Sequence, residues 1–328
     1  MIQRLARIWL KHPEVGVIFV SIILVVIFNS STEGIWLSLF NIREVLRITA
    51  ILAILALGEA FVVSTGQIDI SVGSMFGIAG ILYIGLTPEI GPLPAIAIAM
   101  IAAMLIGCMN GLIVAYLGIP SLVVTLGSLF LFRGIAIAAS NAQAAFSFSI
   151  TRDIRENPIL RLFGGGDVLD YNNAIIWVII AVIVVQYIFS LHPLGNKILA
   201  VGGDAPSARS RGVRVRRVML GVFIVSGFFA GLAGVLEGSK LGYVDGAFGR
   251  LMELQAIAVV VLGGTALLGG RTSVIGTLFG AFILSAIQSY LVIQGIQPQW
   301  FTLILGAIIV LVALFDRLMR DSLVRFAK

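Results

Sequence analysis

The chain has 328 residues, of which 59% are hydrophobic and only 12% are charged, and its formal net charge is +6. Soluble domains are about half apolar and a quarter charged, so this composition excludes a water-soluble globular protein. The apolar runs are about 20 residues long and do not alternate with polar residues, which is typical of membrane-spanning helices. We therefore expect an all-α polytopic membrane protein.

The apolar runs, taken in chain order, predict about ten spans. They lie at Val15 to Phe28 and at 45–65, 70–87, 93–117, 120–140, 174–191, 218–237, 251–268, 273–293 and 300–315. The run 251–268 ends in the glycine-rich string GGTALLGG, which makes part of it a candidate re-entrant segment. Two segments outside the spans, about 141–173 and about 193–217, are too short to fold alone. Residues 1–328 are therefore predicted to form a single transmembrane domain.

Ten crossings place both termini on one side of the membrane. The same side receives HPLGNKILAVGGDAPSARSRGVRVRR, residues 192–217, with its cluster of arginines. The positive-inside rule makes this side cytoplasmic, so the segment 141–173 is predicted to be extracytoplasmic. The basic excess then lies under the anionic leaflet of the inner membrane. Membrane lipid accounts for the net charge, and no nucleic-acid partner is predicted.

Several catalytic and metal-binding motifs are missing from the sequence. The string nearest to a P-loop, GGTALLGGRTS at 263–273, lacks the lysine that reaches the phosphates of a nucleotide. The lone cysteine, Cys108, lies within an apolar run, and no Cys/His cluster predicts a metal site. We therefore predict no enzyme and no energy source in this chain. Carboxylates in or near the spans keep ion coupling open: Glu59, Asp69, Glu237 and Glu253.

The cytoplasmic segment contains a predicted short helix. Asp204 is a suitable N-cap, Pro206 suits the first turn, and Gly212 suits the stop. Arg209 and Arg211 lie toward the C-terminal end, where the helix dipole favours cations. The helix is predicted to lie flat beneath the membrane, where it either binds anionic lipid or docks against a separate cytoplasmic partner.

Four strings together resemble one protein family. They are GQIDISVGS at 66–74, IPSLVVTLG at 119–127, VGGDAPSARSRGV at 201–213 and AIAVVVLGGTALLGGRTSVIGTLFGA at 256–281. In this order they resemble the permease subunits of ribose-type ABC importers of the carbohydrate-uptake class, autoinducer-2-type permeases included. The likeness covers about residues 45–315 and implies the ten-helix type II importer fold of the vitamin B12 importers. Two departures are Gln67, where the family usually has glycine, and Ser210-Arg211, where it has a leucine-serine pair.

The resemblance also implies partners. They are separate ATPase subunits that hold ATP and Mg, a second permease subunit, identical or paralogous, and an extracytoplasmic solute-binding protein; this chain itself binds no cofactor. The resemblance implies that the predicted short helix is the coupling helix, which sits in a groove of the ATPase. Its residues are Asp204, Ala205, Pro206, Ser207, Ala208, Arg209, Ser210, Arg211 and Gly212. The implied cargo is a ribose-like monosaccharide; nucleosides, autoinducer 2 and amino acids stay open, and the alternative function is an ion-coupled secondary transporter.

Five polar residues are candidates for lining the translocation path. They are Gln67, Asp69, Asn110, Gln255 and Gln288. Each could instead make a hydrogen bond between helices. Asp69 stands between two predicted spans on the cytoplasmic side, and three roles are open to it. It caps the next helix together with Ser71, lies at the inner mouth of the path, or takes part in proton coupling.

Overall fold

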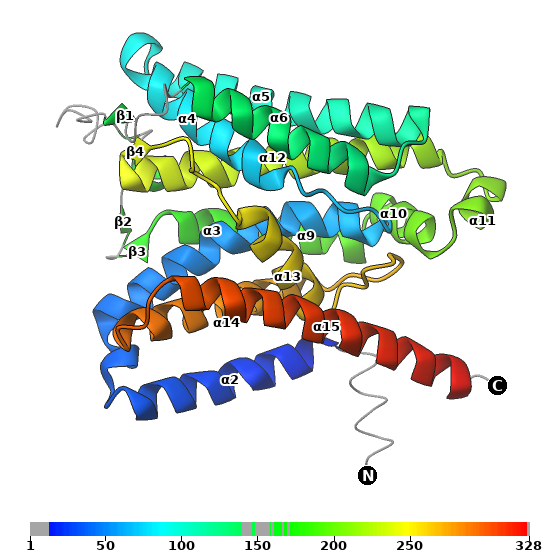
Figure 1. Cartoon of the computed structure of the whole chain (residues 1–328). Helices are drawn as coiled ribbons and strands as arrows, with labels where there is room; N and C mark the ends of the chain where they lie inside the picture. The colour runs from blue at the N-terminus through cyan, green and yellow to red at the C-terminus, as the bar shows by residue number, and fades with distance from the viewer. Residues whose placement is uncertain are drawn as a thin grey trace.

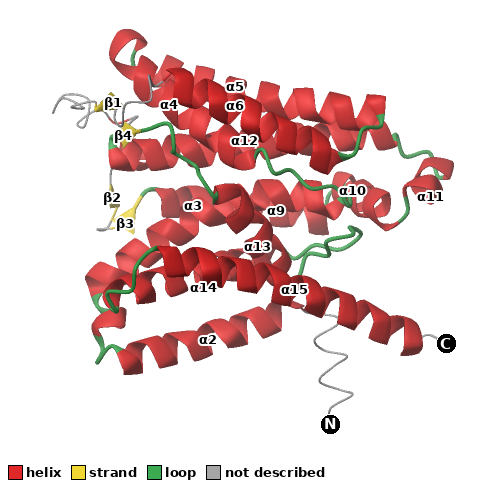
Figure 2. Cartoon of the chain, viewed as in Figure 1, coloured by secondary structure: helices red, strands yellow, loops and turns green. Residues whose placement is uncertain are grey.

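A computed structural model describes residues 13–139, 146–147, 158, 161–165, 167–168 and 171–326 of the chain. Long helices lie side by side in one bundle (Figure 1), and loops join them at its two ends (Figure 2). The predicted extracytoplasmic segment 141–173 lies mostly outside the described residues. Two short antiparallel strand pairs lie at one end of the bundle (Figure 1). They are β1 (Phe146–Ser147) with β4 (Tyr243–Val244) and β2 (Asp167–Val168) with β3 (Tyr171–Asn172).

The first half of the chain contains α2 (Pro13–Ser31), η1 (Ile35–Leu37), α3 (Leu39–Ser64), α4 (Val72–Ile90), α5 (Pro92–Leu112), η2 (Ile113–Leu117), α6 (Ser121–Ala139), β1 (Phe146–Ser147) and η3 (Arg161–Gly165). The second half contains β2 (Asp167–Val168), β3 (Tyr171–Asn172), α9 (Ala174–Ser190), α10 (Pro193–Gly203), α11 (Ala205–Ser210), α12 (Val215–Leu241), β4 (Tyr243–Val244), α13 (Met252–Leu262), α14 (Val274–Ile293) and α15 (Gln299–Phe326).

Among the described residues, seven helices are long and apolar enough to cross a membrane, and the bent pair α9–α10 raises the number to eight. The chain is therefore a multi-pass membrane protein. Every predicted span overlaps a helix, but the run 251–268 is helical only over 252–262. A helix of this length covers about 16 Å, roughly half the hydrocarbon thickness. The count of about ten crossings stays a prediction, because α13 and the apolar part of α15, Gln299–Leu314, are shorter than a full span.

Helix α3 lies at the centre of the bundle. Its residues from Thr49 to Ser64 are all buried, including the carboxyl group of Glu59. A helix that is apolar on every side belongs in a protein interior. By contrast, α2 exposes Phe19, Ile22 and Val26 on its outer side, which suits contact with lipid acyl chains. The core is therefore built around α3 and its neighbour α12, and the outer helices face the membrane.

The helices pack in two similar groups, one around α12 and one around α3. Helix α12 packs against α4 and α5, while α3 packs against α13 and α14; similarly, α6 packs on α4 and α15 on α13. Figure 1 shows that α3 and α12 run in opposite directions through the bundle. This is the pattern of an inverted repeat, in which α3–α6 correspond to α12–α15, and it is frequent among transporters. The loops after α3 and α12, at 65–71 and 242–251, each lead into a helix that packs on the opposite repeat.

Glycines bring α5 and α12 into backbone contact. A Cβ on Gly107 would lie 2.3 Å from the carbonyl oxygen of Phe223, and a Cβ on Gly227 would lie 2.4 Å from that of Ala103. The spacing Gly-x3-Gly places small residues on one face of a helix, so that two helices pack closely in lipid. These glycines therefore allow the close packing of α5 and α12.

Replacement of Gly107 by alanine is expected to lower the free energy of unfolding by about 1–3 kcal/mol, because the new methyl group forces α5 and α12 apart. Thermal unfolding of the purified protein in detergent measures the effect. The control is Gly134→Ala in α6, where a Cβ has open space. Equal unfolding temperatures for the two variants would contradict the close approach of the helices.

Candidate functional site

Helices α10 and α11 form an elbow at one end of the bundle. Helix α10 bends by 70° from α9. The bend starts at His192, whose Nδ1 accepts a hydrogen bond from the N–H of Leu194 at 3.2 Å, and Pro193 occupies the first turn. Gly195 lets α10 fold back, since a Cβ there would lie 2.3 Å from the carbonyl oxygen of Ile188. Figure 1 shows that α2 begins, and α15 ends, at the same end of the bundle as this elbow.

The predicted short helix is confirmed as α11. Asp204 is its N-cap residue with an extended backbone, and its carboxylate accepts a hydrogen bond from the Ser207 hydroxyl. At the other end, Gly212 has a φ of +85° and donates to the carbonyl of Arg209, while Val213 donates to that of Ala208. These two bonds form a Schellman motif, which stops the helix where the sequence predicts.

Most of α11 is exposed. Ala208 faces the protein, while Asp204, Pro206, Ser207, Arg209, Ser210, Arg211 and Gly212 are exposed and Ala205 is half-buried. An open hollow of about 600 Å³ lies beside the helix. Its lining residues are Tyr116, Arg209, Val213, Arg214, Val215, Arg216 and Arg217. The elbow therefore presents a basic, exposed surface at this end of the bundle.

Four glycines lie where the elbow meets the rest of the bundle. We call them the glycine junction: Gly66, Gly202, Gly269 and Gly270. The N–H of Gly270 donates to the carbonyl oxygen of Ser64, at the end of α3, at 3.0 Å. A Cβ on Gly202 would lie 1.9 Å from that same oxygen, and a Cβ on Gly269 would lie 2.6 Å from the nitrogen of Gly66. Gly66, Gly269 and Gly270 have φ values of +76°, +82° and +80°, which suit glycine. The elbow thus touches the end of α3 and the loop before α14 backbone to backbone, and the loop before α14 in turn touches Gly66 in the loop before α4.

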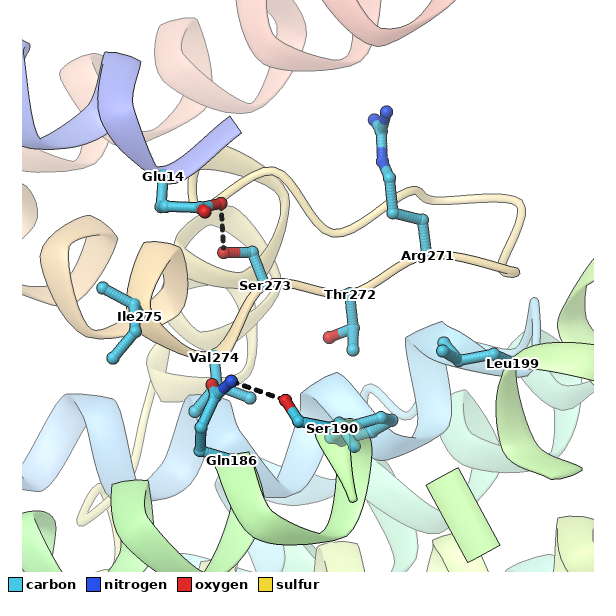
Figure 3. Close-up of a pocket in the computed structure, with 10 residues that line it drawn as sticks. Glu14, Gln186, Ser190, Leu199, Arg271, Thr272, Ser273, Val274 and Ile275 are labelled. Carbon is cyan, nitrogen blue, oxygen red and sulfur yellow. Dashed lines mark hydrogen bonds between the residues drawn. The ribbon is translucent and has the colours of Figure 1, made fainter. Parts of the chain in front are cut away.

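A small cavity of about 250 Å³ lies near this junction, between the start of α2, the end of α9 and the start of α14 (Figure 3). The Ser273 hydroxyl donates to Oε2 of Glu14 at 3.4 Å, and Gln186 donates to the Ser190 hydroxyl at 2.7 Å. Ser273 also caps α14 by accepting from the N–H of Gly276. The cavity therefore adjoins the loop that carries Gly269 and Gly270.

Two of the path candidates, Asp69 and Asn110, meet through Ser71 in a buried polar cluster. Oδ1 of Asp69 accepts from the N–H and the hydroxyl of Ser71, at 2.9 and 2.5 Å, and Oδ2 accepts from Ser226 at 3.3 Å. The amide of Asn110 donates to the Ser71 hydroxyl at 2.8 Å. The N–H of Asp69 donates to Glu59 at 3.1 Å. Asp69 thus supports the start of α4, but it is fully buried and also bonds α3 and α12.

The other path candidates lie apart from this cluster. Gln67 is half-buried in the loop after α3, and Gln255 is half-buried on α13. Gln288 is half-buried near the end of α14, beside Ser289, which bonds Asn41 at the start of α3. The lining role of Gln67, Gln255 and Gln288 therefore stays a prediction.

Three ion pairs among the described residues were not predicted from the sequence. Arg47 on α3 contacts Glu237 on α12 at 2.5 Å and Glu44 at 2.6 Å. Arg133 on α6 lies 3.4 Å from Glu253 on α13. The partners Arg47–Glu237 and Arg133–Glu253 are more than a hundred residues apart in the chain, so only their isolated charges inside apolar runs could have indicated them.

A bundle of inverted helix groups with an exposed basic elbow defines a membrane transport protein. The chain belongs to the family described as "Branched-chain amino acid transport system / permease component", whose model matches residues 41–313. It is similar to the autoinducer 2 import system permease protein LsrC of Escherichia coli (strain K12 / DH10B), with 32% identity over 93% of this chain and 87% of the relative. It is also similar to two proteins of Escherichia coli (strain K12). These are the xylose transport system permease protein XylH (30%, covering 92% and 91%) and the D-allose transport system permease protein AlsC (30%, covering 95% and 93%). No solved structure matches the chain.

Replacement of Asp69 by alanine is expected to lower the free energy of unfolding by about 1–3 kcal/mol, because it leaves the buried donors of Ser71 without their acceptor. The variant Asp69→Asn retains one acceptor oxygen and is expected to unfold between the wild type and Asp69→Ala. Thermal unfolding in detergent gives the order. A variant Asp69→Ala as stable as Asp69→Asn would show that the cluster does not depend on this acceptor.

Proposed function

We propose that this chain is the permease subunit of an ATP-binding-cassette importer and forms half of the translocation path for a small sugar. The observation that carries the proposal is the exposed α10–α11 elbow, whose backbone touches the end of α3 and the loop before α14. The chain has no P-loop lysine at 263–273, so the energy comes from separate ATPase subunits that hold ATP and Mg. A solute-binding protein delivers the sugar from the opposite side.

A sugar is the favoured cargo, although the family is described by branched-chain amino acids. The relatives named for autoinducer 2, xylose and D-allose each align with more than nine-tenths of this chain. Transport assays with xylose, D-allose, autoinducer 2, leucine and a nucleoside, each with the cognate binding protein, separate the two classes. If leucine is the only compound taken up, the proposed cargo is wrong and the cargo is an amino acid.

The arrangement in the membrane follows from charge and from the repeat. The end that carries α11 and its arginines is cytoplasmic, together with both termini. The ten crossings are α2, α3, α4, α5, α6, α9, α12, α13, α14 and α15, in the type II fold of the vitamin B12 importers. A second permease subunit completes the path. Support comes from the inverted exchange of α3–α6 with α12–α15.

In this proposal the ATPase acts on the permease through α11. The helix sits in a groove of the ATPase, and closure of the two ATPases on ATP moves the elbow. Because Gly202 contacts Ser64 and Gly270 directly, the movement reaches the loops before α4 and α14 without passing through a flexible side chain. The path thereby switches from inward-facing to outward-facing.

The second candidate is an ion-coupled carrier, which the buried carboxyl groups of Glu59 and Asp69 favour. Reconstitution of the chain alone into liposomes distinguishes the two functions. Uptake driven by a proton or sodium gradient without ATP supports the carrier. Uptake only with ATP, the ATPase and the binding protein supports the importer.

The double variant Arg209→Glu and Arg211→Glu is expected to abolish uptake and stimulated ATPase activity, because it reverses the charge of the surface that meets the ATPase. Membrane insertion should be normal, since both side chains are exposed. The control is Lys197→Glu on α10, an exposed basic residue at the same end of the bundle. Normal ATPase stimulation in the double variant would remove α11 from the coupling role.

Replacement of Gly202 by alanine is expected to uncouple the elbow from the bundle. The added methyl group would lie 1.9 Å from the Ser64 carbonyl oxygen, so the junction must open. We expect ATP hydrolysis to continue while uptake per ATP falls at least fivefold. The matched control is Gly203→Ala, where a Cβ meets open space. The same loss in both variants, or in neither, would show that the junction does not transmit the movement.

A further inference from the structure

Arg133 lies well inside the bundle, between the two ends of α6. Twelve residues separate it from Ser121, which corresponds to about 18 Å along the helix axis. Its Nη2 atom lies 3.2 Å from the carbonyl oxygen of Gly249 and 3.4 Å from Oε2 of Glu253. The Arg133 side chain is 19% exposed and that of Glu253 only 7%. A charged pair therefore lies deep in the bundle, and its arginine side chain is partly exposed.

Glu253 is held in place by the starts of two helices. It belongs to the first turn of α13, which follows a sharp bend at Gly249 and Leu251 with φ values of +82° and +66°. Its carboxylate also lies against the first turn of α4, because a Cβ on Gly73 would fall 1.9 Å from Oε2. Helix N-termini stabilise a negative charge, so the carboxylate does not depend on Arg133 alone.

Among the described residues, Arg133 retains N–H donors that find no partner. A guanidinium has five N–H donors. Within the described residues, Nη2 makes both contacts of Arg133, and both are long for charge-assisted bonds. A charged group at this depth costs several kcal/mol if it faces lipid. The guanidinium donors that the described residues leave unused must therefore face water or another protein chain.

We propose that Arg133, together with Glu253, contacts the transported solute in the translocation path and that the solute is a polyhydroxylated molecule. The inference rests on the proposed function and extends it. A sugar hydroxyl donates one hydrogen bond and accepts others, whereas a guanidinium only donates and a carboxylate only accepts. Neighbouring hydroxyl groups of a sugar therefore match the pair.

The placement of Arg133 is tested without any solute. The lone cysteine, Cys108, is replaced by alanine, and a single cysteine is introduced at position 133 or, as the control, at 131. Leu131 lies two positions away, about 200° around the helix, and is exposed as a lipid-facing residue should be. We expect a water-soluble, charged thiol reagent in the assembled transporter to modify R133C at least tenfold faster than L131C. Equal rates would overturn the proposal, since they place Arg133 against lipid or against the partner permease.

If R133C does not fold, the double variant R133C with Glu253→Gln removes the unpaired carboxylate and is labelled in the same way. Uptake then tests the solute contact, with xylose, D-allose and autoinducer 2 as probes. Loss of a hydrogen bond to a charged group predicts at least a tenfold fall in uptake for Arg133→Gln. ATPase stimulation by the binding protein should stay within twofold of the wild type.

The control for charge is Arg250→Gln, an exposed arginine in the same loop as Gly249, which should transport at the wild-type rate. Unchanged uptake in Arg133→Gln would overturn the solute contact. A wild-type protein that moves none of the three sugars, even with ATPase and binding protein, refutes the proposed function instead. The thiol experiment would still decide whether Arg133 faces water.

Discussion

The hydrogen bond from the N–H of Gly270 to the carbonyl oxygen of Ser64 is the interaction on which the arrangement at the α11 end depends. It joins the end of the central helix α3 to the loop before α14, and Gly202 of α10 packs against the same carbonyl. A protein immersed in lipid must satisfy its backbone groups internally, so a chain that leaves helical geometry there needs such partners. Glycine at these positions makes the approach possible, because any side chain would occupy the space of another backbone.

The loops after α3 and α12, at 65–71 and 242–251, are related by the inverted repeat. The loop after α3 carries Asp69 and leads into α4, while the loop after α12 carries Gly249 and leads into α13. The start of α4 is supported by the Asp69 carboxylate, and Glu253 in the first turn of α13 lies against Gly73 of α4. Helix starts inside a membrane protein concentrate positive potential and unpaired N–H groups, which is why carboxylates are found beside both.

Hydropathy was sufficient to place the helices, because a stretch of lipid-facing helix needs an apolar run of fixed length. The capping residues also placed α11, since Asp204 and Gly212 act locally. Helix α10 was not predicted, although Pro193 at its start and the buried pair Ile198 and Val201 were local signals for it.

Long-range relations were not accessible in the same way. The burial of Asp69 depends on Ser226, far away in sequence, and the pair Arg133–Glu253 depends on how α6 meets α13. The glycine-rich end of 251–268 made part of this run a candidate re-entrant segment. The end of α13 at Leu262 was not predicted, because the apolar composition continues past it into the glycine-rich loop. The length of an apolar run therefore gave an upper limit to the length of the helix, and tertiary packing decided where the helix ended.

The ion pairs of Arg47 have a mechanical consequence for the whole bundle. They tie α3 to α12 at the end opposite the glycine junction, through Glu237 at 2.5 Å, with Glu44 on the same arginine. The two central helices are thus clamped by charge at one end and meet the elbow at the other. In the proposed mechanism, a push at the elbow end would rotate the two helices about this ion pair. Displacement would then be greatest at the end that carries α11 and smallest where Arg47 holds the helices together.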